Sequence, residues 1–97
     1  MFDINTVNDR QIVTFPDRLD TLACEKMGPQ LAQTLAQPGR AVTFDLAGVR
    51  YVSSAFLRIC LRAVQALGQE NVELVHVGPE VKKVFKIAGL DSQLTIR

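Results

Sequence analysis

A short and almost wholly apolar run is the feature of this sequence that most limits its fold. Residues 41–46 read Ala-Val-Thr-Phe-Asp-Leu and show little of the polar alternation expected of a strand with one face in water. Such a run suits a strand covered on both faces, as in a parallel sheet with helices packed against it. The neighbouring segments are therefore expected to supply helices.

Residues 19–36 have the spacing of a first helix. Gly28-Pro29 interrupts this segment, because proline lacks an amide hydrogen and its ring clashes with the carbonyl of Glu25. We expect a kink there or a late start of regular helix, and residues 37–40 to end the helix. Apolar residues recur at every fourth position and share one helical face: Ala23, Met27, Leu31 and Leu35.

Two further helices are predicted. The second spans residues 53–67 and is closed by Gly68, a usual residue just past a helix end. The third begins at Gly78 with proline in its first turn, and Gly89 stops it. Its expected buried face consists of Val81, Val84, Phe85 and Ala88.

Strand-forming runs occupy four other segments. Residues 2–7 and 11–15 flank a polar turn and predict an antiparallel hairpin. Residues 72–77 predict another strand, and residues 94–96 add a strand at the terminus. The order β-β-α-β-α-β-α, with that terminal strand, predicts one α/β domain over residues 1–97. Its sheet is mixed, with a hairpin followed by parallel strands and right-handed crossovers.

Charge and composition exclude several classes of function. A net charge of +1 gives no field that favours nucleic acid, and no run approaches the roughly 20 apolar residues needed to cross a bilayer. We expect a cytoplasmic protein without membrane insertion. Cys24 and Cys60 form no metal-binding spacing with His76, so both cysteines are predicted to be reduced packing residues, and no metal or cofactor is expected. His76 is predicted to be a core or strand-end residue with no orienting partner.

Three segments carry a resemblance to a known family. Residues 45–57 are similar to the signature of the STAS family, an apolar strand followed by D-L-x-x-V, two residues and D-S-S-G-L. Residues 18–20 resemble the segment before the first helix of that family, and residues 81–91 resemble its V-x-x-x-L/F-x-x-x-G-L-D ending. The chain thus resembles a STAS domain of the anti-sigma factor antagonist type.

The resemblance implies a regulatory binding module and not an enzyme. The phosphoacceptor of the family falls on Ser54, and Ser53 and Asp45 belong to the adjacent switch loop. The family aspartate before the phosphoacceptor is Ser53 here, and Phe56 stands where glycine is usual. The implied partner is an anti-sigma factor with serine kinase activity, which binds the module and switches it off by phosphorylating Ser54.

The serine pair also has a purely structural interpretation. Ser53 and Ser54 stand where a loop becomes a helix, where a serine side chain can accept a hydrogen bond from a first-turn amide. A reciprocal capping box is excluded, because no Glu or Gln follows either serine by three residues. A phosphate at the same place would lie beside the positive end of the helix dipole.

The second helix is apolar on more than one side. We expect its core-facing residues to be Leu57, Cys60, Val64 and Leu67. The remaining apolar residues either pack under a neighbouring helix or form a protein contact. In the second case the partner-binding residues are Phe56, Ile59 and Ala63.

Two other functions stay open at this point. The first is a constitutive, non-phosphorylated STAS subunit of another assembly, such as a lipid transporter or a sensory complex. The second is a nucleotide-binding protein that uses the loop before the second helix, although no phosphate-cradling glycine loop is present. A homodimer also stays open, and no catalytic residues are predicted.

Overall fold

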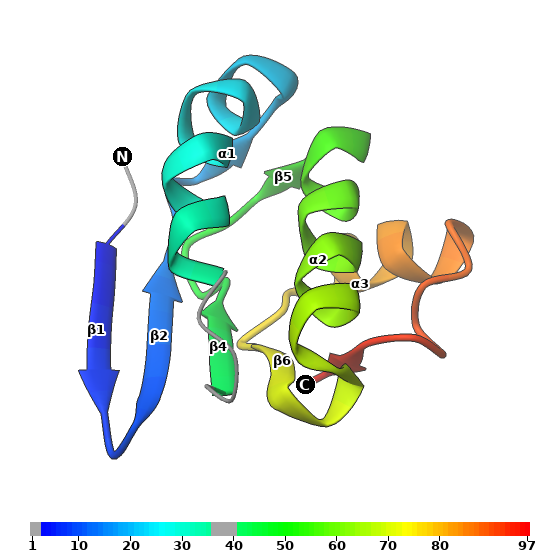
Figure 1. The fold of residues 1–97 in the computed structure, drawn as a ribbon. Coiled ribbons are helices and arrows are strands. Elements are labelled where there is room, and N and C mark those ends of the chain that lie inside the picture. The colour runs from blue at the N-terminus through cyan, green and yellow to red at the C-terminus, as the bar shows by residue number, and fades with distance from the viewer. Residues whose placement is uncertain (1–2, 36–40) are drawn as a thin grey trace.

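The protein is built on a five-stranded mixed sheet (Figure 1). The structure is a computed structural model that describes residues 3–35 and 41–97. The strand order is β1-β2-β4-β6-β7. The first two strands pair antiparallel and every other pair is parallel, so the predicted mixed sheet is confirmed. The strand bounds are β1 (Asp3–Val7), β2 (Arg10–Thr14), β4 (Ala41–Asp45), β6 (Val72–Val75) and β7 (Thr95–Ile96).

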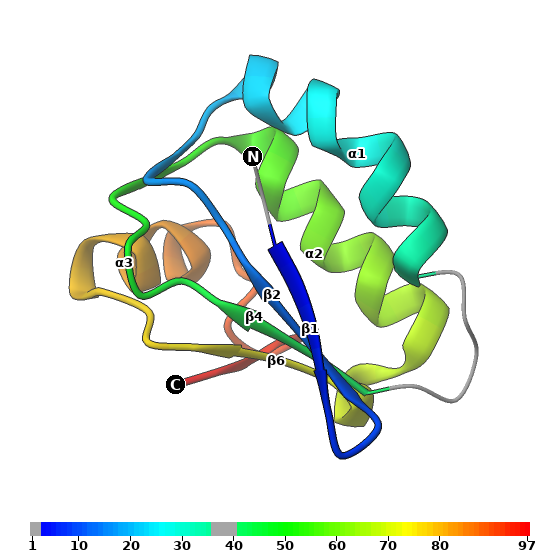
Figure 2. The ribbon, with the colours of Figure 1, turned by 90° about the vertical axis from the view of Figure 1, so that its left-hand side faces the viewer.

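The described residues form three α-helices beside the sheet, and Figure 2 shows α1 and α2 together on one of its sides. Pro29 lies inside α1, so the predicted late start of this helix is wrong. The helix begins instead at Thr21, directly after Asp20, whose Oδ1 accepts a hydrogen bond of 2.8 Å from the amide of Ala23. The predicted helix end at residues 37–40 lies outside the described residues. The bounds are α1 (Thr21–Leu35), α2 (Ser54–Leu67) and α3 (Pro79–Ile87), with a 3-10 turn at Gln69–Asn71.

Glycine ends two of these helices as predicted. Gly68 follows α2 with a φ of 90°, and Gly89 follows α3 with a φ of 76°. Residues with a Cβ adopt this left-handed region at a cost, which explains why glycine occupies both positions. The buried face of α3 is narrower than expected, because Val81 and Phe85 are buried whereas Val84 and Ala88 are exposed.

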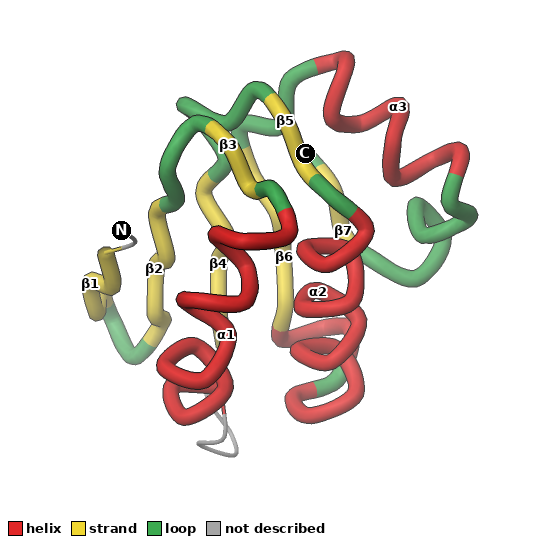
Figure 3. The backbone as a smooth tube through the Cα atoms, turned by 90° about the horizontal axis from the view of Figure 1, so that it is seen from above, coloured by secondary structure: helices red, strands yellow, loops and turns green. Residues whose placement is uncertain are grey.

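The sequence patterns did not predict a second sheet, which has two strands. Strands β3 (Arg18–Leu19) and β5 (Tyr51–Val52) pair parallel, and Figure 3 shows them side by side, each leading into a helix. The ladder continues past β5, because the amide of Ser53 donates a 2.8 Å hydrogen bond to the carbonyl of Leu19. The starts of α1 and α2 are therefore tied to each other through the backbone.

Four phenylalanines form the centre of the core. The ring of Phe15 packs edge-on against Phe44 and Phe56, at centroid distances of 5.4 and 5.2 Å. Phe56 also meets Phe85 edge-on at 6.5 Å. Edge-to-face contacts of this kind add to the stabilisation from burial alone. Phe56 thus joins α2 to β4, to the segment after β2 and to α3.

The packing of Phe56 corrects the predicted orientation of α2. Leu57 and Val64, which were expected to face the core, are only half-buried. The buried face keeps Cys60 and Leu67 as predicted, but it includes Phe56 and Ala63 in place of Leu57 and Val64, because the large Phe56 ring occupies the centre of the core. The residues on that face are Phe56, Cys60, Ala63 and Leu67.

Strand β4 is covered on its second face by polar side chains. Thr43 is only 5% exposed, because it accepts a 2.8 Å hydrogen bond from Nη1 of Arg10 and donates a 3.0 Å bond to Oε1 of Glu73. Glu73 also pairs with Arg10 at 3.3 Å and with Arg97 at 3.5 Å. The apolar run at residues 41–46 is thus buried as predicted, but its outer cover is this network across β2, β4 and β6.

We predict that Phe56→Ala lowers the free energy of unfolding by about 3–5 kcal/mol, because it leaves a large cavity among the other three rings. Urea denaturation monitored by circular dichroism measures this change. The matched control is Ile87→Ala, which truncates a side chain that is 77% exposed and is expected to stay within about 0.5 kcal/mol. A Phe56→Ala effect as small as that of the control would contradict the packing described here.

Candidate functional site

Ser53 and Ser54 stand at the start of α2 but differ sharply in accessibility. Ser53 is the residue before the helix and is only 8% exposed, whereas Ser54 is its first residue and is exposed. Within the described part of the chain, the Ser54 hydroxyl forms no hydrogen bond. Of the two serines, only Ser54 presents a free hydroxyl to a protein that approaches this end of the helix.

Side-chain capping does not explain the pair. Ser53 has extended backbone angles, but its side chain makes no cap hydrogen bond, and its hydroxyl lies instead 3.9 Å from the Cys24 sulfur. The backbone of Ser53 caps the start of α2 instead, because its carbonyl accepts hydrogen bonds from the amides of Phe56 and Leu57 at 3.0 and 3.3 Å. The structural interpretation of the serines as side-chain caps is therefore wrong for Ser53.

The electrostatic surroundings of Ser54 favour an anion. The first amides of a helix have no partner within it, and the helix dipole places partial positive charge at this end. The first turn of α2 contains no acidic side chain. Arg58 is exposed and follows Ser54 by four residues, the spacing at which helical side chains are neighbours.

Two contacts hold the Asp45 side chain at the loop after β4. Its Oδ1 accepts a 3.0 Å hydrogen bond from the amide of Ala47 and lies 2.9 Å from Nδ1 of His76. The parallel register places Asp45 beside Val75, so the residue after Val75 comes within reach of the carboxylate. Asp45 therefore shapes the loop that leads toward β5 and Ser54 through these two bonds.

His76 was predicted to be a core or strand-end residue with no orienting partner. The structure places it at a strand end, as one alternative held, but gives it a partner. Strand β6 ends at Val75, and His76 is exposed with a φ of 56°. Its partner is Asp45, on the neighbouring strand. The sequence offered no sign of this contact, because it depends on the register between two strands 31 residues apart.

The predicted partner-binding residues are only partly accessible. Phe56 and Ala63 are fully buried, so their assignment to a partner surface is wrong: both fill the core. Ile59 is half-buried and faces the space between α1 and α2. The sequence interpretation missed Tyr51, which is 46% exposed three residues before Ser54 and stacks under the guanidinium of Arg18 at 5.2 Å.

Both cysteines are free thiols in the core. Burial raises the pKa of the Cys60 thiol well above its ordinary value, and burial also raises the pKa of Cys24, against a smaller lowering by its contact with Ser53. A protonated, buried thiol is a poor nucleophile. The prediction that both cysteines are packing residues agrees with their burial.

We predict that neither thiol of the folded protein reacts readily with iodoacetamide at pH 8, because both are buried and held in the protonated form. Mass spectrometry against time measures the extent of alkylation. The control is the protein unfolded in guanidinium chloride, in which both thiols should react at least about tenfold faster. Rapid alkylation of either thiol in the folded protein would contradict this burial.

The described residues offer no evident metal site and no membrane span. No group of three or more His, Cys, Asp or Glu side chains among them is arranged to hold a metal ion. Within the same residues, no helix is long and apolar enough to cross a membrane.

Comparison with known proteins identifies the family. The family model described as "Mlab, STAS domain" matches residues 4–96 of the chain. The chain therefore belongs to the STAS domain family, as the resemblance in residues 45–57 implied. The mixed sheet with three α-helices is the fold expected for such a domain.

Three known proteins illustrate the similarity. The Bordetella bronchiseptica protein named "Putative anti-sigma factor antagonist BtrV" is 37% identical over 67 residues, which cover 67% of this chain and 58% of BtrV. The structure of an anti-sigma-factor antagonist (STAS) domain protein from Planctomyces limnophilus has a TM-score of 0.87 at 19% identity, and the match covers 99% of this chain and 87% of that one. The Bacillus cell fate determinant SpoIIAA in its phosphorylated form has a TM-score of 0.72 at 18% identity, with 100% and 91% covered.

Proposed function

We propose that this protein is an anti-sigma factor antagonist that binds an anti-sigma factor and is switched by phosphorylation of Ser54. The observation that carries the proposal is the exposed Ser54 hydroxyl at the first position of α2. The antagonist function named for BtrV and the phosphorylated form of SpoIIAA support the proposal by similarity. The protein itself is not an enzyme, and it acts with its partner in the cytoplasm.

The folded domain can accommodate a phosphate on Ser54. The group would add about −1.5 to −2 charges at pH 7, at the helix end where unpaired amides and the dipole favour anions. Ser54 is exposed, so the phosphate stays hydrated and displaces no core residue. Arg58, one turn along the same face, can pair with it. The modification therefore leaves the fold intact.

A bound partner would respond differently to the same phosphate. A protein docked over the start of α2 would enclose a hydrated dianion within its contact surface, and removing its water is costly unless the partner supplies matching charges. Each loss of about 1.4 kcal/mol weakens binding tenfold. One phosphate is therefore sufficient to release the partner.

The partner is proposed to be the serine kinase that modifies Ser54. We predict that incubation with this anti-sigma factor and ATP adds one phosphate to the wild-type protein and none to Ser54→Ala, as measured by intact-protein mass. The matched control is Ser53→Ala, which removes the adjacent but buried hydroxyl and should leave phosphorylation intact. Phosphate transfer that persists in Ser54→Ala would overturn the assignment of Ser54.

We further predict that phosphorylated protein binds the anti-sigma factor at least about tenfold more weakly than unmodified protein, because the phosphate lies within the contact. Isothermal titration calorimetry measures both affinities. Phosphatase treatment is the control and should restore the original affinity. Equal affinities would mean that the protein is a constitutive subunit rather than a switch.

A further inference from the structure

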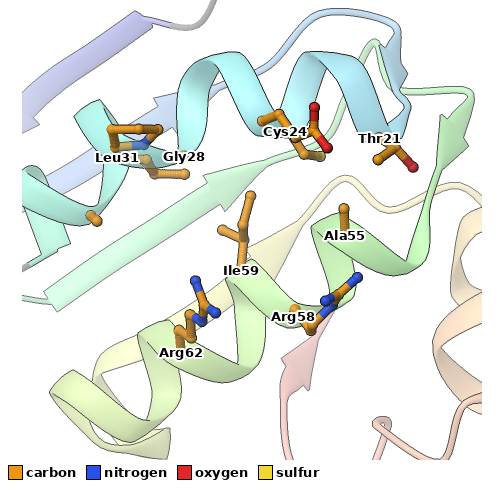
Figure 4. A pocket seen from close by; sticks show the side chains of 11 residues that line it. Thr21, Cys24, Gly28, Leu31, Ala55, Arg58, Ile59 and Arg62 are labelled. Carbon is orange, nitrogen blue, oxygen red and sulfur yellow. The ribbon is translucent and has the colours of Figure 1, made fainter.

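A groove between α1 and α2 shares Arg58 with the switch proposed above but is otherwise separate from it. It has a volume of about 430 Å³ and lies between one long face of α1 and two turns of α2. Figure 4 shows Ile59 reaching from α2 toward α1, with Arg58 and Arg62 beside it on the same helix. The groove is lined by Thr21, Cys24, Glu25, Gly28, Pro29, Leu31, Ala32, Ala55, Arg58, Ile59 and Arg62.

The floor of the groove is apolar. Leu31 is 1% exposed and Cys24 is 4% exposed, and Ile59 is half-buried between the two helices. Gly28 borders open space, since a Cβ at this position would meet no atom within 4 Å. An apolar surface of this shape gains free energy when a nonpolar ligand displaces its water.

Two arginines line the groove on the α2 side without a partner. Arg58 and Arg62 are exposed, four residues apart, and neither forms an ion pair within the described residues. Like charges at this spacing repel each other on a helix. An anion between them would relieve this repulsion and accept hydrogen bonds from both guanidinium groups.

Glu25 faces this pair from α1 and determines where an anion can bind. It is exposed and, within the described residues, pairs with neither arginine. Its negative charge repels an anion from the α1 side of the groove. A negatively charged headgroup is therefore directed to the α2 side, where Arg58 and Arg62 lie.

The size and shape of the groove suit a small linear ligand. From Thr21 to Ala32 its wall extends about 16 Å along α1, at 1.5 Å per residue. Its volume of about 430 Å³ falls in the range of roughly 300–1,000 Å³ that is typical of small-molecule sites. A long, narrow apolar floor with a positive charge at one side matches a chain with an anionic head.

We propose that the groove between α1 and α2 binds a single-chain amphiphile with an anionic headgroup, a carboxylate or a phosphate. The acyl chain lies along Leu31, Ile59 and Gly28, and the headgroup is held by Arg58 and Arg62. The groove lining does not include Ser54, so either proposal can fail without the other.

The test is a titration of the ¹⁵N-labelled protein with decanoate and with decyl phosphate, each kept below the concentration at which it forms micelles. Saturable shifts of the amide signals of Ala32, Ala55 and Ile59 are expected for at least one of the two, and the tighter ligand identifies the headgroup. Decyltrimethylammonium and decanol are the matched ligands with a positive and a neutral head. Equal binding of either control ligand, or no saturable shift with both anions, would overturn the proposal.

Variants test the two halves of the groove separately. The double substitution Arg58→Gln and Arg62→Gln should weaken binding about tenfold or more, whereas Arg50→Gln, at an exposed arginine outside the lining, should have no effect. Gly28→Leu fills the groove and should abolish binding while the circular dichroism spectrum stays helical. Glu25→Gln should strengthen binding. Unchanged affinity in both the double variant and Gly28→Leu would show that the ligand binds elsewhere.

A protein partner is the competing occupant of the groove. If the anionic amphiphiles leave the groove signals unchanged and the same amides are protected from hydrogen exchange only in the complex with the anti-sigma factor, the groove is a protein contact. That result would overturn the amphiphile proposal and leave the switch at Ser54 intact.

Discussion

The packing of Phe56 among three other phenylalanine rings determines what α2 presents to the outside. Each residue turns an α-helix by about 100°, so residues two positions from Phe56 lie on nearly the opposite side. Ser54 and Arg58 are those residues, and both are exposed while Phe56 is fully buried. The exposure of the proposed phosphoacceptor is therefore a direct result of the packing of the core.

The short β3–β5 ladder determines where this helix begins. Hydrogen bonds from the amides of Arg50 and Ser53 to the carbonyls of Asp17 and Leu19, both 2.8 Å long, hold the segment before α2 against the segment before α1. The two helices therefore start at the same edge of the molecule (Figure 3). Their common start aligns them along their lengths and leaves the groove between them.

The sequence predicted the positions of the helices and strands better than which face of each helix is buried. The hairpin, the buried strand and the helix ends at Gly68 and Gly89 follow from local chemistry, and the structure has all of them. The rotation of α2 about its axis does not follow from local chemistry, because apolar residues on several sides of the helix allow more than one buried face. Only the shape of the core selects Phe56 over Leu57.

The missed contacts are all long-range. Strands of two residues are too short to show a period, so β3 and β5 left no pattern. The contacts of Asp45 with His76 and of Arg10 with Thr43 depend on strand register between distant segments. The position of Ser54 was predicted because a family motif marks it, whereas the groove was not, since its walls come from two helices that only the fold brings together.

Arg58 can contact an anion at either of two sites, the groove and a phosphate on Ser54, since it lines the groove and follows Ser54 by one helical turn. One guanidinium cannot be fully engaged by two anions. A phosphate on Ser54 therefore lowers the affinity of the groove for an anionic ligand. By thermodynamic linkage, the bound ligand disfavours the phosphorylated state by the same free energy. A single side chain would in this way make the phosphorylation state of the protein sensitive to a small molecule that never touches the serine.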